Sequence, residues 1–382
     1  LTMTKIHPPV SVVMPVFNPD IQFFKEAIKS VQTQIYPHWE LCIADDASTD
    51  PQIPRLIEAF AQEDARIKFI IRKENGHISA CSNTALSLAT GKFIALLDHD
   101  DKLHPLALYE TTKAINQHKN VKIIYSDEDK ITKNGRRIDP YFKPDFDYEL
   151  LLSHNMISHL GVYHHDVIKK IGGFREGLEG SQDYDLLLRI LEQVEENQIH
   201  HIPRVLYHWR ISEQSVAQSL DVKPYAILAG KQAINEHLER LEIKGNAEIL
   251  ENSGGYRINY QLPEPQPSVE LIVPIRNPTD KTDSFIKEIL NNTTYTNFHI
   301  TLIIRKIEFN ELKFTKKFIS SKDQLACHLT PTGTKFVDEI NDFVDEISAD
   351  YIGILTPNLV GFSPGWLEVL ISQAHQNKIG AV

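Results

Sequence analysis

The stretch Phe93-Ile94-Ala95-Leu96-Leu97-Asp98-His99-Asp100-Asp101 decides the fold of this chain. Its first five residues are apolar, as in a buried strand, and three carboxylates follow within four residues. In parallel α/β sheets, ligands bind at the carboxyl ends of the strands. The stretch therefore predicts both a fold class and the edge of the sheet that carries the chemistry.

Strands and helices are predicted to alternate around this stretch. Val10–Met14 is a short β-branched run that indicates a buried strand ending at Pro15. Leu41–Ala44, Ile67–Ile71 and Val121–Tyr125 read as further strands, separated by segments with helical spacing of apolar residues. Strict alternation predicts an α/β fold, a mostly parallel sheet between helices.

The length of 382 residues predicts two domains. We place the first domain at 1–252, a linker rich in proline and glycine at 253–267, and a second domain at 268–382. The second domain repeats the first. Pro15, Asn18, Pro19 and Tyr36 recur 259 positions later as Pro274, Asn277, Pro278 and Tyr295.

The repeat is incomplete and has lost the acidic residues. The counterpart of Asp45-Asp46 is Ile304-Arg305, and that of Asp98-His99-Asp100 is Thr356-Pro357-Asn358. The second copy, as present here, is therefore expected not to catalyse. Packing against the first domain, positioning a long acceptor and mediating assembly remain open roles for it.

Composition limits the partners. A net charge of -11 argues against nucleic acid, which requires a basic face. Cys42, Cys81 and Cys327 form no Cys-x-x-Cys pair and lie in apolar settings, which indicates buried thiols in a reducing compartment. No apolar run approaches the ~20 residues that span a bilayer. The cytoplasm is the expected location, with a peripheral place at the cytoplasmic face of the inner membrane as an alternative.

The carboxylates of Asp98, Asp100 and Asp101 repel one another unless a positive charge lies between them. A hard divalent cation such as Mn²⁺ or Mg²⁺ meets that demand and leaves positions for substrate phosphates. The alternative is a solvated turn, or a helix cap formed by Asp101. Asp45–Asp50 is a second acidic loop, in which Asp46 is expected to bind a ligand, and Ser48 or Asp50 to cap a helix.

Taken together, these motifs resemble those of family two glycosyltransferases of the GT-A fold, in particular members that build bacterial O-antigens and other surface polysaccharides. The resemblance covers residues 8 to 215, in the family's order. It rests on Val10–Asn18, Asp45–Asp50, Asn75–Ser79, Asn83, Asp98–Asp101, Tyr125–Asp129, Gly172–Arg175, Gly180–Asp185 and Tyr207–Arg210.

The resemblance implies how a donor would bind. The backbone at Pro15 and the ring of Phe17 would border the nucleobase, and Asp46 would hydrogen-bond it. Asp98 would serve the ribose or the metal, and Asp100 would ligate the metal. The donor would be a nucleotide diphosphate sugar, with UDP as the first candidate and dTDP or GDP as alternatives.

It also implies the chemistry. Asp183 matches the catalytic base, which takes the proton from an acceptor hydroxyl as the oxygen attacks the anomeric carbon with inversion. The acceptor would be a saccharide or a lipid-linked saccharide. His208 matches a histidine that ligates the same metal or contacts the diphosphate. The residue before the base, often Glu in the family, is Gln182 here. A capping role for Asp183 is the structural alternative.

Two other functions were weighed against this one. A nucleotidyltransferase needs a glycine-rich, basic loop after its first strand, whereas Pro15–Asp20 holds neither glycine nor a cation. A non-catalytic scaffold that binds nucleotide sugars remains open for the second copy, but residues 1–250 keep every acidic position. The sequence therefore favours a metal-dependent glycosyltransferase with its site in the first copy.

Overall fold

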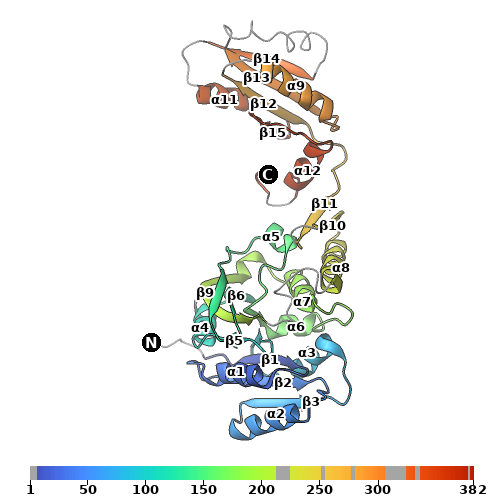
Figure 1. Cartoon of the computed structure of the whole chain (residues 1–382). Helices are drawn as coiled ribbons and strands as arrows, with labels where there is room; N and C mark the ends of the chain where they lie inside the picture. The colour runs from blue at the N-terminus through green and yellow to red at the C-terminus, as the bar shows by residue number, and fades with distance from the viewer. Residues whose placement is uncertain are drawn as a thin grey trace. The chain divides into compact units, whose positions relative to one another are not determined.

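The computed structural model describes residues 7–211, 224–250, 254–276, 280–305, 324–331, 336–376 and 379–382. The chain divides into two compact units, Leu1–Ile258 and Asn259–Val382 (Figure 1). The division falls within 253–267, the stretch predicted to be a linker, although Tyr256–Tyr260 of this stretch forms strand β11 and pairs with β10, Gly245–Ile249. None of the described helices is long and apolar enough to cross a membrane.

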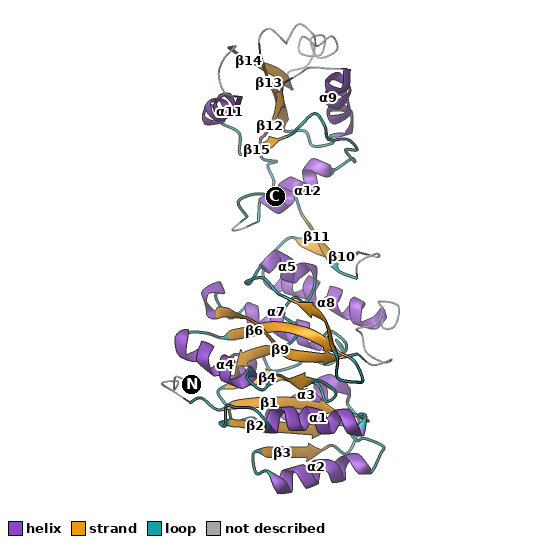
Figure 2. Cartoon of the chain, turned by 60° about the vertical axis from the view of Figure 1, so that its left-hand side comes forward, coloured by secondary structure: helices purple, strands orange, loops and turns teal. Residues whose placement is uncertain are grey.

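The N-terminal half of the first unit is a parallel sheet in the order β3-β2-β1-β4, as Figure 2 shows. Its strands are buried because they consist almost entirely of apolar residues, and α3 packs on β1 and β2. The elements are β1 (Val10–Val16), α1 (Ile21–Gln32), β2 (Trp39–Asp45), α2 (Gln52–Glu63), β3 (Ile67–Ile71), α3 (His77–Ser87) and β4 (Phe93–Leu96).

Strand β1 does not end at Pro15, as the sequence predicted, but runs on to Val16. Proline is tolerated there because its missing N–H faces the β4 side of the strand, where the ladder has already ended at Val13 and Leu96. The other side stays paired, since Pro15 lies opposite Ala44 of β2. The carbonyl of Pro15 is left at the sheet edge, close to the acidic stretch.

The second half of this unit continues the same nine-stranded sheet through β8, β6, β9 and β5, and it adds antiparallel pairs to the mostly parallel sheet that was expected. Strand β8 is antiparallel to both β4 and β6, whereas β6 and β9 are parallel to each other. Helix α7 begins two residues before the predicted Tyr184 and ends at Leu191. The elements are β5 (Lys102–Leu103), α4 (Ala107–Gln117), β6 (Ile123–Ile131), β7 (Arg137–Tyr141), α5 (Tyr148–Ser153), β8 (Gly161–His164), α6 (His165–Lys170), α7 (Gln182–Leu191), η1 (Glu196–Gln198), β9 (Ile199–Arg210) and α8 (Pro224–Arg240).

The second unit contains a parallel sheet in the order β14-β13-β12-β15. Its register repeats that of the first unit, because Val269 lies opposite Phe298 as Val10 lies opposite Trp39. Of the repeated residues, Asn277 and Pro278 lie outside the described part of the chain. The elements are β12 (Val269–Ile275), α9 (Asp280–Asn292), β13 (Phe298–Arg305), β14 (Leu325–Thr330), α11 (Phe336–Asp345), β15 (Tyr351–Ile354) and α12 (Trp366–Ala374).

Candidate active site

The acidic stretch lies at the carboxyl end of β4, as the sequence predicted. The N–H of Leu97 donates to the carbonyl of Val13, which extends the contact between β4 and β1 by one residue. Beyond it, Nδ1 of His99 lies 3.2 Å from the carbonyl of Pro15, and the N–H of Asp98 lies 3.3 Å from the hydroxyl of Tyr207. The stretch is thus attached to strands on both sides, and Asp98 and Asp100 stay partly exposed.

Asp101 has a structural role that differs from the capping role considered from the sequence. Its carboxylate accepts the hydroxyl of Tyr207 at 2.6 Å and the N–H of Arg210 at 2.6 Å, whereas the N-cap of α4 is Leu106. Nε of Arg210 donates to the carbonyl of Asp100 at 2.7 Å. Burial, together with the neighbouring Asp100 and Asp98, raises the pKa of Asp101 well above its usual range. These bonds fix the acidic stretch to β9.

His208, on the same strand β9, is buried and oriented by a carboxylate. Its Nδ1 lies 2.6 Å from Oδ1 of Asp129 on β6. Burial lowers the pKa of His208, although the hydrogen bond with Asp129 opposes the shift. A histidine held through one nitrogen by a carboxylate offers the other nitrogen to a ligand, the arrangement common among metal-binding histidines.

Asp183 lies in the first turn of α7 but does not cap it, since the N-cap residue is Ser181. Its Oδ2 accepts a hydrogen bond from Nδ2 of Asn155 at 2.9 Å. Burial raises the pKa of Asp183; the nearby charge of His159 lowers it, and that of Asp98 raises it. Asn155 is four residues from His159, which has a ligand atom within 4.8 Å of one from Asp98, so residues 155–159 link the start of α7 to the end of β4.

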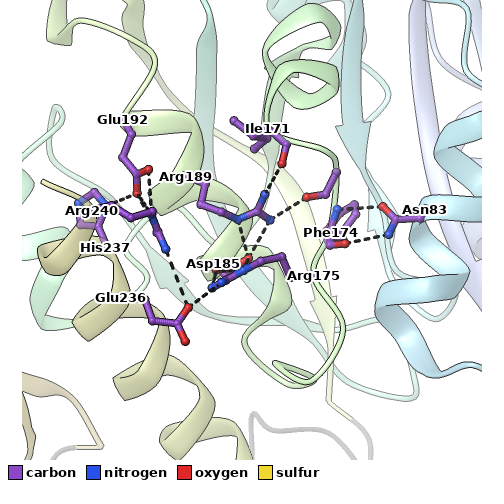
Figure 3. A network of polar contacts seen from close by, with 11 residues as sticks. Asn83, Ile171, Phe174, Arg175, Asp185, Arg189, Glu192, Glu236, His237 and Arg240 are labelled. Atoms are coloured by element: carbon purple, nitrogen blue, oxygen red, sulfur yellow. Dashed lines mark hydrogen bonds and ion pairs between the residues drawn. The ribbon is translucent and has the colours of Figure 1, made fainter.

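Helix α7 is held in place by the network of ion pairs in Figure 3. Asp185, fully buried on this helix, pairs with both Arg189 and Arg175. Arg189 also donates to the carbonyls of Ile171 and Gly173 at 3.0 and 2.7 Å. Arg175 continues to Glu236 on α8 at 2.6 Å. Two of the sequence motifs, Gly172–Arg175 and Gly180–Asp185, therefore contact each other and orient the helix that carries Asp183.

The tight turn at 172–175 requires glycine at position 173. Gly173 has a φ of +75°, and a Cβ at this position would lie 2.5 Å from Oδ1 of Asn83. The side chain of Asn83 bonds the backbone of Phe174 twice, each time at 2.8 Å. The Gly172–Arg175 loop is thereby fixed to α3, and through α3 to the parallel half of the sheet.

Asp46, predicted to bind the nucleobase, is buried at the end of β2. One oxygen lies 2.8 Å from Nε of Arg72, and the carboxylate also accepts the N–H of Gly76 at 3.0 Å. It thus fixes the loop between β3 and α3. In the same acidic loop, Asp50 accepts the N–H of Gln52 at 2.8 Å, but the N-cap of α2 is Pro51, and Ser48 bonds Asp45, so neither predicted residue is the N-cap. The aromatic ring of Phe17 is 45% exposed at the same sheet edge.

Among the described residues, one group of three has ligand atoms within 4.8 Å of one another: Asp98, Asp101 and His159. Carboxylate oxygens suit Mg²⁺ and Mn²⁺, although both oxygens of Asp101 already accept hydrogen bonds from Tyr207 and Arg210. The group contains neither Asp100 nor His208, the two ligands implied by the resemblance. Asp98 and Asp100 follow one another at the end of β4, so the residues present fit a divalent ion bound at this edge of the sheet.

Two residues of the site were not identified from the sequence. Asn155 and His159 both lie outside the motifs that carry the resemblance. Both lie in the irregular segment between α5 and β8, where no periodicity marks a functional position. His159 stacks on Tyr207 with 4.4 Å between ring centroids. Spacing alone could not reveal this contact, because it depends on how β8 and β9 are placed.

Residues 11–172 match the family model described as "Glycosyl transferase family 2". Over 98% of its length the chain is 38% identical to "Uncharacterized protein y4gI" of Sinorhizobium fredii and 30% identical to "O-antigen biosynthesis protein RfbC" of Myxococcus xanthus. The chain spans 41% and 29% of these two relatives.

Among solved structures, the chain is similar to S. aureus TarS 1-349 in complex with UDP-GlcNAc. The two are 20% identical, with a TM-score of 0.49 over 61% of this chain and 72% of that one. The family match covers β1 to α6, so it includes the parallel sheet and the acidic stretch after β4.

Proposed function

We propose that the first unit, whose residues 11–172 match the glycosyl transferase family 2 model, has the GT-A fold and transfers a sugar from a nucleotide diphosphate sugar to an acceptor hydroxyl. The observation that carries the proposal is that residues 155–159 contact both acidic positions: Asn155 donates to Asp183 at the start of α7, and His159 has a ligand atom within 4.8 Å of one from Asp98 at the end of β4. Donor binding and proton transfer require groups at these two places, which are remote in sequence.

Asp98 and Asp100 would hold a divalent cation, Mn²⁺ or Mg²⁺, and His208 would present its free nitrogen to the ion or to the diphosphate. The hydrogen bond from His208 to Asp129 supports this role, since it fixes the orientation of the ring. His159 is a further candidate ligand. When bound, the cation would neutralise the diphosphate and stabilise it as a leaving group.

Asp183 would act as the general base. One of its oxygens is held by Asn155, and the other can accept the proton of the acceptor hydroxyl. The hydroxyl oxygen forms a bond to the anomeric carbon as the bond from this carbon to the diphosphate oxygen breaks, with inversion and release of the nucleoside diphosphate. Pro15, Phe17 and Asp46 would border and bind the nucleobase. Asp46 would do so with a carboxylate already oriented by Arg72 and Gly76.

The proposed donor is a UDP-sugar, and the proposed acceptor a saccharide or lipid-linked saccharide in O-antigen or another surface polysaccharide. The similarity to a relative named for O-antigen biosynthesis, over nearly the whole chain, supports this choice. The reaction would take place in the cytoplasm or at the cytoplasmic face of the inner membrane. The second unit would not catalyse and would serve assembly or acceptor binding.

The test is a panel of donors: UDP-glucose, UDP-galactose, UDP-N-acetylglucosamine, UDP-glucuronic acid, GDP-mannose and dTDP-rhamnose. The full chain is incubated with each, in Mn²⁺, in Mg²⁺ or in excess chelator, and release of the nucleoside diphosphate is measured. We expect slow hydrolysis of at least one donor that depends on the metal. Hydrolysis at full rate in chelator would contradict the metal dependence, and no release from any donor would contradict the transferase.

A further inference from the structure

We propose that Asn155 is the positioning residue of Asp183, and that a buried ion pair, Lys143 with Glu128, fixes the segment that carries it. This inference rests on the proposed function, because it assigns Asp183 to proton transfer. Its geometric basis is the hydrogen bond from Nδ2 of Asn155 to Oδ2 of Asp183, at 2.9 Å. The bond leaves Oδ1 of Asp183 for an acceptor hydroxyl.

Only one orientation of the Asn155 amide allows hydrogen bonds at both its oxygen and its NH₂ group. Its Oδ1 accepts the N–H of Ser158 at 3.1 Å, so the NH₂ group must face Asp183. Ser158 has a φ of +36°, a left-handed conformation that a residue other than glycine keeps only where its surroundings hold it. The tight turn at 155–158 therefore aims the amide at the carboxylate.

The ion pair between Lys143 and Glu128 stabilises the backbone of this turn and of His159, which follows it. The Lys143 side chain is 0% exposed, and its Nζ lies 3.0 Å from Oε2 of Glu128. The same Nζ donates to the carbonyls of Ile157, at 2.6 Å, and His159. Oε2 of Glu128 also accepts the N–H of His159 at 3.0 Å. The buried ammonium of Lys143 stabilises one conformation of the segment. Without Glu128 its charge would be unpaired, and without either carbonyl a buried N–H would have no acceptor.

Asn155 contributes a side-chain donor to Asp183, in addition to the backbone groups of Tyr184 and Asp183 and the charges of His159 and Asp98 that also act on this carboxyl. A hydrogen bond to the charged form of a carboxyl lowers its pKa. Asn155 should therefore keep Asp183 ionised to lower pH and hold it in a fixed orientation, two requirements for a general base.

The experiment compares Asn155→Ala and Asn155→Asp with the full-length parent chain. Asparagine and aspartate have the same shape, so Asn155→Asp keeps the acceptor for Ser158 but loses the donor and adds a like charge. Asn197→Ala, at an exposed position on η1, is the matched control. The Asp183 carboxyl is titrated by ¹³C NMR in chain labelled at aspartate, its signal assigned by its loss in Asp183→Asn, and folding is checked by thermal unfolding.

We expect the pKa of Asp183 to rise by roughly one unit in Asn155→Ala and by more in Asn155→Asp. Turnover of the donor found with the panel should fall about tenfold in Asn155→Ala and further in Asn155→Asp, with affinity for UDP and Mn²⁺ unchanged. A purely structural role predicts the opposite order, because Asn155→Asp keeps the bond to Ser158. That order, or an unchanged pKa of Asp183, would overturn the inference whether or not the chain transfers sugar. Unchanged turnover in Asp183→Asn would instead overturn the proposed base.

Discussion

The parallel sheet of the first unit and that of the second have equivalent strand orders, but the polar residues at the carboxyl ends of their strands differ. The sequence offset between paired residues is nearly the same in both: Leu41 lies opposite Ile67, and its counterpart Ile300 lies opposite Leu325, one residue short of an exact repeat. In each unit, the hydroxyl of a buried tyrosine donates a hydrogen bond to the carbonyl of a proline just before the first strand. Tyr36 donates to the carbonyl of Pro8 at 2.9 Å, and Tyr295 to that of Pro267 at 2.7 Å.

The two units diverge wherever a polar side chain meets the end of a strand. Asp46 corresponds to Arg305, and Asp100 to the exposed Asn358. Even a polar pair within the sheet is exchanged: Ser11 with Glu40 in the first unit becomes Glu270 with His299 in the second. Apolar packing and backbone pairing are sufficient to keep this half-fold, so the residues at its edge are free to gain or lose chemistry.

The largest expected difference between the units concerns donor binding with metal. Asp100→Asn should weaken the Mn²⁺-dependent affinity for UDP by more than about tenfold, because the proposed ligand of the ion is lost. His208→Ala should cause a milder loss. The counterpart substitution Asn358→Ala is the control and should leave the affinity unchanged. Isothermal calorimetry on the full chain gives all three values. An equal loss in Asn358→Ala would place a donor site in the second unit.

The polar pairs inside the two sheets should respond to pH in opposite directions. Burial alone would raise the pKa of Glu40, but hydrogen bonds from Lys68, Ser11 and Thr90 outweigh it and lower the pKa from 4.5 to about 2. Its stabilisation is present above pH 4.5 and is lost as the pH falls towards 2. The hydrogen bond that His299 donates to Glu270 raises the pKa of His299, so this contribution is present below 6.5 and is lost as the pH rises through the folded value.

Hydrogen exchange followed by mass spectrometry can measure this difference, because it reports separately on β1–β2 and β12–β13. Protection of β2 should be lost in acid, and that of β13 should weaken slightly above neutral pH. Glu40→Gln should remove the first dependence and His299→Gln the second. Because the His299 side chain is 36% exposed, its effect should be the smaller one. The same pH response in both sheets would contradict the assignment of these pairs.

The smallest expected effect is also the one that should be equal in both units. Tyr36→Phe and Tyr295→Phe each remove one hydroxyl that donates to a proline carbonyl. Each substitution should lower the stability of its own unit by about 1 kcal/mol, the usual net value of a hydrogen bond. Exchange rates in the affected sheet provide the measurement, with the untouched sheet as the internal control. A loss of stability in one unit alone would show that the two tyrosine hydrogen bonds do not contribute equally.

Sequence patterns predicted the parallel half of the fold because each of its strands is a short apolar run followed by polar residues. They failed at Pro15, where tolerance depends on where the β4 ladder ends. They did not predict strand β8, because its antiparallel placement between β4 and β6 is set by tertiary packing and not by periodicity. The mostly parallel α/β class was therefore predicted, whereas the antiparallel strand inserted into it was not.

In the candidate site too, some residues could be predicted from the sequence and others could not. Asp98 and Asp183 were identified by motif, and the structure links them through residues 155–159, which contact Asp183 at Asn155 and lie beside Asp98 at His159. Asp101 belongs to the same motif, yet it accepts bonds from Tyr207 and Arg210, and only the path of β9 determines this. Asn155 lies outside every motif considered. Its function depends on a tight turn and on a buried lysine, features with no sequence period.

The most direct test of the account is the turnover of Asp183→Asn with the donor found by the panel. General-base removal typically costs about 10²–10⁴-fold, so turnover should fall by that factor while affinity for UDP and Mn²⁺ stays unchanged. The variant should remain folded, and at neutral pH even gain stability, because burial raises the pKa of Asp183 and disfavours its ionised form. Full turnover, or loss of donor binding together with turnover, would contradict the assignment of Asp183 as the base.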